Sequence, residues 1–325
     1  MAERSLRLLC WADYLAPATL ARFETETGIR IDGVWYTGED AAAARVLAGE
    51  PFDVVVASDY FIERYRHAGV LQPLDTERLP GLAGVTDQRL RRPPCDPETD
   101  GRKYLSPLYF GTEGIAARID LVTHVGLSWE MLFDPQFAGR IAMLDEAREV
   151  LSAALYLLGE SPNSTDRDVL ERATAMLIEQ RPLVLRYDSD TPWRSIVDGV
   201  ALVHCFGGDV ARAINHGVAQ VRYIRPHEGF TIWIDGPCIP AAAADPDAAH
   251  RFIEFLLDPA VAAANADHSG YHPAVDAADA LIRSLVQRSM RPTHEQIETG
   301  TFLADVGESN EVYERCYARV RAGTA

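Results

Sequence analysis

Residues 230–240 read FTIWIDGPCIP. The run is mostly apolar, and its one carboxylate, Asp235, stands two positions after Trp233. In an extended strand, residues two positions apart project to the same face. We therefore expect the indole and the carboxylate to share one face, with Ile232 and Ile234 on the other.

An indole beside a carboxylate suits an alkylammonium ion. The ring attracts the cation by about 0.5–2 kcal/mol, and the carboxylate adds a charge-assisted hydrogen bond worth about 1.5–3 kcal/mol. The competing interpretation is a core tryptophan at a strand end beside an exposed aspartate. A second copy of the pattern, WADY at residues 11–14, follows the apolar run 6–10. It favours the ligand interpretation, because two strand ends far apart in sequence can meet in one cleft.

Composition restricts the class of protein. The 325 residues suffice for two domains of ordinary size, and the apolar (47%) and charged (24%) fractions are those of a soluble globular protein. No uncharged apolar run approaches about 18 residues, so we expect no membrane span. The formal charge of −17 argues against a nucleic-acid partner and is compatible with cationic ligands.

The five cysteines are widely spaced, with no CxxC and no Cys/His pattern of a metal site. We expect most of them to be buried as small apolar residues, and we expect no metal or cofactor; a disulfide is neither asserted nor excluded. The N-terminus, MAERSLRLLCW, enters a strand almost at once and lacks the pattern of a secretory signal. A processed periplasmic protein and a cytoplasmic protein both fit this start.

The first hundred residues alternate strand and helix patterns. Such alternation predicts right-handed crossovers and a mainly parallel sheet. Ligands bind at the carboxyl ends of the strands in such sheets, which is where residues 11–14 and 58–60 fall. The expected strands are 6–11, 30–36 and 52–57, and the expected helices are 17–27, 40–47 and 60–67.

A second group of acids opens a later helix. After a helix at 126–133 and a strand at 140–144, the sequence DEARE (145–149) begins a helix that runs to Leu158, with Asp145 as its expected N-cap. Glu146 and Glu149 then lie on one helix face. Complementation of the helix dipole alone also explains these acids.

The order of elements indicates two regions with a hinge. The chain leaves the first α/β region near residues 110–112 and returns to it near residues 233–235. A domain assembled from discontinuous segments in this way is typical of proteins whose two halves close on a ligand.

Seven motifs extend along nearly the whole chain: WADY, FDVVVASDY (52–60), DEAREV (145–150), DSDTP (188–192), WIDGPCIP (233–240), SGYHP (269–273) and DVG (305–307). In these motifs the sequence closely resembles bacterial spermidine/putrescine-binding proteins, the solute receptors of polyamine ABC transporters. The resemblance implies an α/β, type II periplasmic-binding-protein fold, in which two α/β lobes are joined by a hinge of crossing strands with the ligand cleft between them. The N-terminal lobe would comprise residues 1–111 and 234–280, and the C-terminal lobe residues 112–233 and 281–325. It also implies a periplasmic monomer that binds a polyamine and works with the membrane permease and ATPase subunits of an importer.

The resemblance also assigns ligand-binding residues by position. Two positions depart from the family: Phe206 stands where spermidine receptors have Trp, and Leu303 where they have Gln. Asp13 matches an acid of the family but is one methylene shorter than the Glu found there. Phe206 keeps a ring at its position, and Ser58 and Ser189 match polar positions. The matching aromatic residues are Trp11, Tyr14, Tyr60, Trp233 and Tyr271, and the matching acids are Asp13, Glu146, Glu149 and Asp235.

Three alternatives remain beside a di- or polyamine receptor. An enzyme would need a catalytic motif, and the chain has no GxSxG, no glycine-rich phosphate loop and no HExxH, so we expect no catalysis. A receptor for another cationic solute is the second alternative. A cytosolic protein that sequesters or senses amines is the third.

Overall fold

The computed structural model describes residues 4–323. The chain divides into two compact units: unit 1 comprises Met1–Phe110 and Trp233–Ser289, and unit 2 comprises Gly111–Ile232 and Met290–Ala325. The chain passes from one unit to the other three times. Two of these passages fall inside strands, β5 (Tyr109–Arg118) and β10 (Ile232–Pro240).

Unit 1 is organised around β1 (Ser5–Trp11). This strand pairs in parallel with β2 (Arg30–Tyr36) and with β3 (Val54–Ser58), which confirms the predicted parallel arrangement. β10 is antiparallel to β3 and places Asp235 opposite Ser58. Its direction differs because β10 enters the sheet from unit 2 and not through a crossover helix.

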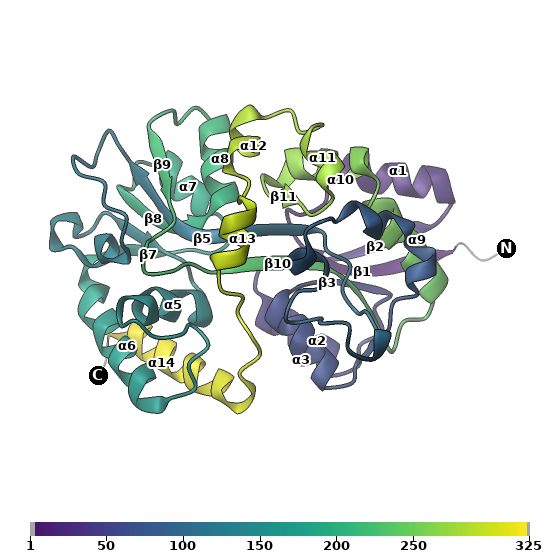
Figure 1. The fold of residues 1–325 in the computed structure, drawn as a ribbon, viewed down its shortest axis with the longest axis horizontal. Helices are drawn as coiled ribbons and strands as arrows, with labels where there is room; N and C mark the ends of the chain where they lie inside the picture. The colour runs from purple at the N-terminus through teal and green to yellow at the C-terminus, as the bar shows by residue number, and fades with distance from the viewer. Residues whose placement is uncertain (1–3, 324–325) are drawn as a thin grey trace. The chain divides into compact units, whose positions relative to one another are not determined.

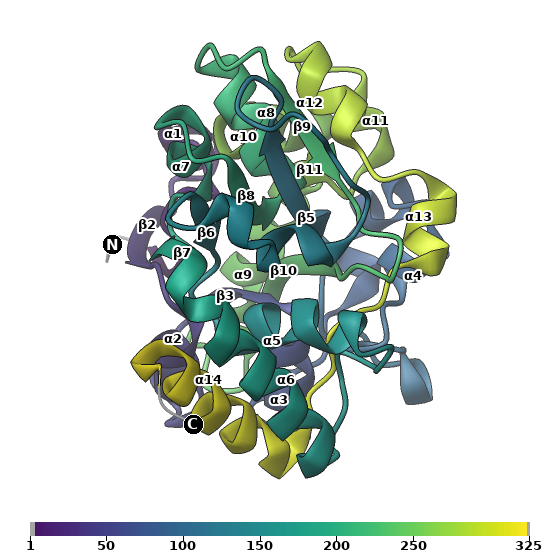
Figure 2. The same ribbon diagram turned by 90° about the vertical axis from the view of Figure 1, so that its left-hand side faces the viewer.

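Helices cover both faces of this sheet. Figures 1 and 2 show α2 and α3 on one face and α1 and α10 on the other, so β1 and β3 are buried apolar strands. α1 ends at Gly28, whose φ of 70° lies in the left-handed region that glycine adopts without strain. The remaining elements of unit 1 are α1 (Pro17–Thr27), α2 (Glu39–Leu47), α3 (Asp59–His67), β4 (Leu71–Gln72), α4 (Gln88–Arg91), α9 (Pro246–Leu256), α10 (Pro259–Ser269), β11 (His272–Pro273), α11 (Asp276–Asp279) and α12 (Leu285–Met290).

Unit 2 has its own sheet, in the order β5–β8–β6–β7 with β9 also paired to β5. β5 is antiparallel to β8, and β6 is parallel to both β8 and β7. The remaining elements of unit 2 are these strands and the helices that connect and cover them. They are β6 (Ile141–Met143), α5 (Ala147–Leu157), α6 (Arg167–Gln180), β7 (Val184–Tyr187), α7 (Pro192–Val197), β8 (Leu202–Phe206), α8 (Gly207–Asn215), β9 (Val221–Ile224), α13 (His294–Thr299) and α14 (Asn310–Ala322).

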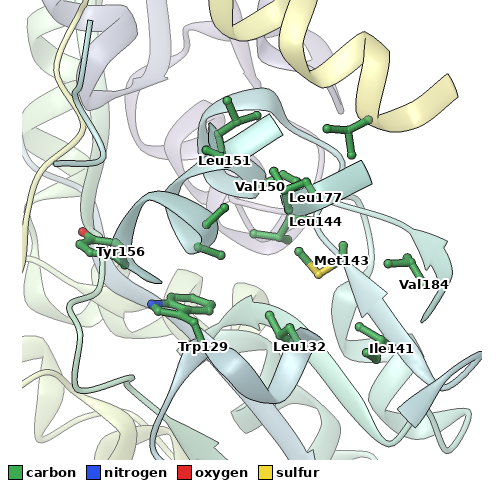
Figure 3. Packing of buried hydrophobic residues seen from close by; sticks show 14 of the residues in the cluster. Trp129, Leu132, Ile141, Met143, Leu144, Val150, Leu151, Tyr156, Leu177 and Val184 are labelled. Atoms are coloured by element: carbon green, nitrogen blue, oxygen red, sulfur yellow. The ribbon is translucent and has the colours of Figure 1, made fainter. Parts of the chain in front are cut away.

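Successive side chains of these strands point to opposite faces of the sheet and contribute to two separate cores. Ile115 and Leu202 pack into a large core with residues of α5, α6 and α14, whereas Ala116 and Val203 face a smaller core with residues of α7 and α8. Figures 1 and 2 show these two helix groups on opposite faces of the sheet. Figure 3 shows the larger core, where the ring of Trp129 lies near that of Tyr156. The sheet face toward α5 is also the face of β5 that carries Glu113, two residues before Ile115.

Two predicted helices differ from the structure. The segment expected as a helix at 126–133 is a 3-10 helix, Trp129–Phe133, with Asp134 as its C-cap. It ends there because Pro135 disfavours helical backbone at the residue before it. The other 3-10 helices are Thr76–Arg78, Pro80–Gly84, Thr99–Gly101, Pro135–Phe137, Arg181–Leu183 and Gly307–Ser309. The second difference is the start of α5, described with the site.

The cysteines agree with the prediction made from their spacing. Cys10, Cys95, Cys205, Cys238 and Cys316 are all free and buried, as expected of small apolar residues. In the described part of the chain, no helix combines the length and the apolar character needed to cross a bilayer.

Candidate functional site

The carboxylate of Asp235 lies at the centre of a buried cluster in unit 1. Asp235 is 4% exposed, and the hydroxyl of Tyr14 donates a hydrogen bond to its Oδ2. Burial raises the pKa of Asp235 to about 7, although hydrogen bonds from Tyr14 and Ser58 act in the opposite direction. The carboxylate therefore changes charge near neutral pH.

Aromatic rings surround this carboxylate. The ring of Tyr14 lies 5.2 Å from that of Tyr109 and 5.7 Å from that of Tyr271, and Tyr271 lies edge-on to Trp233 at 5.2 Å. Trp11 extends the cluster, with its centroid 6.0 Å from that of Tyr14. Because Tyr14 contacts both Asp235 and Tyr271, and Tyr271 contacts Trp233, the indole and the carboxylate project to the same side of β10, as their spacing predicts.

The other sequence-predicted residues of unit 1 are less central. Ser58 ends β3, directly opposite Asp235. Tyr60 lies in the first turn of α3, with its ring 4.5 Å from that of Phe61. Asp13 is exposed in the turn after β1, so the structure does not bury it with Asp235.

The sequence reasoning missed a second buried acid, Glu39. Glu39 is the first residue of α2 and is 5% exposed. Its Oε1 accepts the backbone N–H of Ser58 at 2.8 Å, and its Oε2 is hydrogen-bonded to the Ser58 hydroxyl. Burial, and after it the charge of Asp235, raise the pKa of Glu39 well above its usual value. An acid in the first turn of a helix is common, so nothing in the sequence distinguishes Glu39 from other acids at helix starts.

In unit 2, Glu149 is the acid of the DEAREV motif that is buried. It is 8% exposed, and its Oε2 has no hydrogen-bond partner among the described residues. Burial, followed by the charge of Glu113, raises the pKa of Glu149 to about 7. An acceptor in this state is available to a ligand that carries an N–H donor.

Glu113 and His204 are further buried polar residues that the prediction did not include. Both are fully buried, and His204 Nε2 hydrogen-bonds Glu113 Oε1. Ser152 Oγ lies 3.0 Å from the same Glu113 oxygen and 2.7 Å from the backbone carbonyl of Glu149. The available signal was a carboxylate inside the apolar strand 109–118, opposite Phe206.

The remaining predicted residues lie at element ends in unit 2. α5 begins at Ala147 with Glu146 as N-cap, so the prediction of Asp145 as the cap was wrong. The backbone of Asp145 is instead held by Ser189 Oγ at 2.7 Å, and its carboxylate accepts hydrogen bonds from Tyr317 and Arg321. Phe206 ends β8 and is the N-cap residue of α8. The structure thus brings Ser189 to Asp145, not directly to Glu149.

The two clusters share one electrostatic property. Within residues 4–323, no Lys, Arg or His side chain forms an ion pair with Asp235, Glu39 or Glu149. A buried carboxylate without a cation either keeps a proton or takes a cationic ligand, because an isolated buried charge is strongly unfavourable. Beside aromatic faces, such carboxylates can bind protonated amines.

Comparisons with known proteins give the family. Residues 18–288 match the family model described as bacterial extracellular solute-binding protein. The spermidine/putrescine-binding periplasmic protein of Escherichia coli is 30% identical over 318 residues, covering 96% of this chain and 90% of that protein. The putrescine-binding periplasmic protein PotF of E. coli is also 30% identical, covering 99% and 92%.

A solved structure agrees with these sequence matches. The spermidine/putrescine ABC transporter substrate-binding protein PotD from Streptococcus pneumoniae superposes with a TM-score of 0.82 at 25% identity, covering 98% of this chain and 99% of that one. The likeness confirms the predicted type of fold. The chain belongs to the bacterial extracellular solute-binding proteins.

Proposed function

We propose that this protein is the solute receptor of an ABC importer and that its solute is a di- or polyamine of the putrescine or spermidine class. The observation that carries the choice of ligand is the set of buried carboxylates without a cationic partner, Asp235 and Glu149 foremost. The relatives named for spermidine and putrescine support the same class.

In unit 1, Asp235 supplies the charge and the rings supply the apolar contact. An ammonium group donates to Asp235 in a charge-assisted hydrogen bond, worth about 1.5–3 kcal/mol. The faces of Trp11, Tyr14, Trp233 and Tyr271 attract the same cation and pack on the adjoining methylene groups. Tyr60 and Ser58 complete the proposed contacts, with Asp13 as an acid at the exposed margin.

In unit 2, Glu149 supplies a second anionic acceptor. It lies in the first turn of α5, where the helix dipole favours negative charge, and its Oε2 is without a partner in the described chain. We assign supporting roles to Glu146, Ser189 and Phe206. Leu303 is buried and apolar and cannot hydrogen-bond a nitrogen, so recognition in this unit depends on Glu149.

A receptor of this kind binds its solute, releases it unchanged and delivers it to permease and ATPase subunits in the membrane. We place the protein outside the cytoplasmic membrane because the named relatives are periplasmic. Neither cluster requires a metal or a cofactor for this function.

Isothermal titration calorimetry tests the proposal. The protein is unfolded in urea, dialysed to remove any bound amine, refolded and titrated with putrescine, spermidine, cadaverine and agmatine. Two or three charge-assisted contacts with ring packing predict a dissociation constant near micromolar or below for at least one amine. Asp235→Asn weakens that binding at least about tenfold, whereas Glu311→Gln, which changes a highly exposed acid of α14, does not. Absence of heat with all four amines at millimolar concentration would reject the ligand class.

A further inference from the structure

Glu39 is a buried acid of unit 1 that the proposed function leaves without a role. Its two oxygens are held by the backbone N–H and the hydroxyl of one residue, Ser58. It is 5% exposed, and none of the basic side chains in the described chain forms an ion pair with it. A carboxyl group in this setting is far more stable as the neutral acid than as the anion.

Ser58 connects Glu39 to Asp235. It lies opposite Asp235 across the β3–β10 pair, so the two side chains project to the same face of the sheet. Its hydroxyl is hydrogen-bonded to Glu39, and as a donor it lowers the pKa of Asp235. A hydroxyl carries one proton, so Ser58 can donate to only one of the two carboxyl groups. When neutral Glu39 donates to Ser58 Oγ, the proton of the Ser58 hydroxyl is directed to the Asp235 carboxylate on the neighbouring strand.

The surrounding groups agree with this assignment of the proton. Burial and the charge of Asp235 raise the pKa of Glu39 well above normal, whereas the pKa of Asp235 is about 7. Asp59 is the other acid that acts on Glu39, and it also raises the pKa of Glu39. The other titratable groups near the pair have pKa values raised chiefly by burial and are uncharged at neutral pH: Cys10, Tyr14, Tyr36, Tyr65 and Cys238.

We propose that Glu39 is a positioning residue, which as a neutral acid directs the Ser58 hydroxyl to Asp235 and so keeps that carboxylate ionised and oriented for an ammonium group. The inference rests on the proposed function. It assigns Glu39 no contact with the ligand and no ionic role. A glutamine should therefore replace it, since the amide accepts the Ser58 N–H and donates to Ser58 Oγ with the same geometry.

Three variants test this role through putrescine and spermidine titrations between pH 6 and pH 9. Glu39→Gln is expected to bind within about threefold of wild type, with the same pH midpoint. Glu39→Ala and Ser58→Ala each are expected to lower affinity about tenfold at pH 7 and to move the midpoint upward. The Glu39→Ala/Ser58→Ala double variant should be no weaker than Ser58→Ala, because Glu39 acts through Ser58.

A measurement without ligand separates this inference from the proposed function. Titration of the 13C-labelled aspartate carboxyl groups by NMR follows Asp235, whose resonance is identified by its loss in Asp235→Asn. The midpoint should rise in Glu39→Ala and stay in place in Glu39→Gln, whether or not any amine binds. An unchanged Asp235 midpoint in Glu39→Ala overturns the inference, as does a Glu39→Gln variant that loses as much affinity as Glu39→Ala.

Discussion

Replacing Asp235 by asparagine should stabilise the ligand-free protein while weakening its binding of amines. The physical reason is that burial raises the pKa of this carboxyl to about 7, from 3.8 in its ordinary state. For an acid with a raised pKa, the stabilising form is the protonated one. That stability is fully present below about pH 4 and is lost as the pH rises through 7.

The magnitude follows from the shift. A difference of about three pKa units corresponds to about 4 kcal/mol at pH 8, at 1.36 kcal/mol per unit. Asparagine accepts the Tyr14 hydroxyl bond at its carbonyl oxygen and carries no charge at any pH, so it avoids this loss. For a chain of this length, about 4 kcal/mol raises the melting temperature by about 6 °C.

Thermal and urea unfolding of amine-free protein at pH 5 and pH 8 measure the effect. The gain of Asp235→Asn over wild type should grow by about 2 kcal/mol or more between the two pH values. Glu311→Gln is the control, because an exposed acid contributes little to stability at either pH. A constant difference between Asp235→Asn and wild type across this range would refute the electrostatic reasoning, even if the variant were more stable overall.

Three further changes, in pH, at Tyr14 and at Gly236, have effects that can be measured. Putrescine affinity should fall about one hundredfold from pH 8 to pH 6 in calorimetric titrations. Burial holds the pKa values of both Asp235 and Glu149 near 7, and both carboxylates must be ionised to bind the two ammonium groups. An affinity that does not change with pH contradicts this prediction. Tyr14→Phe removes a hydrogen bond that lowers the pKa of Asp235. The affinity for putrescine should therefore fall about tenfold at pH 7 and much less at pH 9. Equal losses at both pH values would assign Tyr14 a packing role. Gly236→Ala would place a Cβ 2.0 Å from the backbone oxygen of Ser106, and unfolding experiments should show a loss of about 2 kcal/mol or more. Gly126→Ala, which meets only ordinary contacts with Met131, should be nearly neutral.

The sequence predicted the elements of the fold more closely than their boundaries. Alternating apolar strands and capped helices are local patterns, and the predicted helix 17–27 and strand 30–36 match α1 and β2 residue for residue. The start of α5 was misplaced because Asp145 and Glu146 are both acceptable caps by composition. The choice between them is made by α14, whose Tyr317 and Arg321 draw the Asp145 side chain away.

The residues of the candidate site that belong to a motif could be predicted from the sequence. Those that are distinguished only by their burial could not. The i, i+2 spacing of Trp233 and Asp235 fixed their common face. Glu39 and Glu113 could not be found in this way, because an acid at the start of a helix or inside a strand has no distinctive spacing. Glu39 is distinguished by burial without a basic partner and Glu113 by its buried contact with His204, and both are properties of the assembled unit and not of any segment.

That absence also explains why the site holds acids and not their amides. In ligand-free protein at pH 8, the buried charge of Asp235 lowers stability by about 4 kcal/mol. A charge-assisted hydrogen bond and a cation–ring contact together return about 2–5 kcal/mol, which is of the same size. The ligand therefore supplies the positive charge that the folded chain lacks beside Asp235, and a neutral molecule of the same length does not. An asparagine at this position would carry no unpaired buried charge in the ligand-free protein. An ammonium group would then gain little free energy over a water molecule in the same place, and the selectivity for amines would be lost.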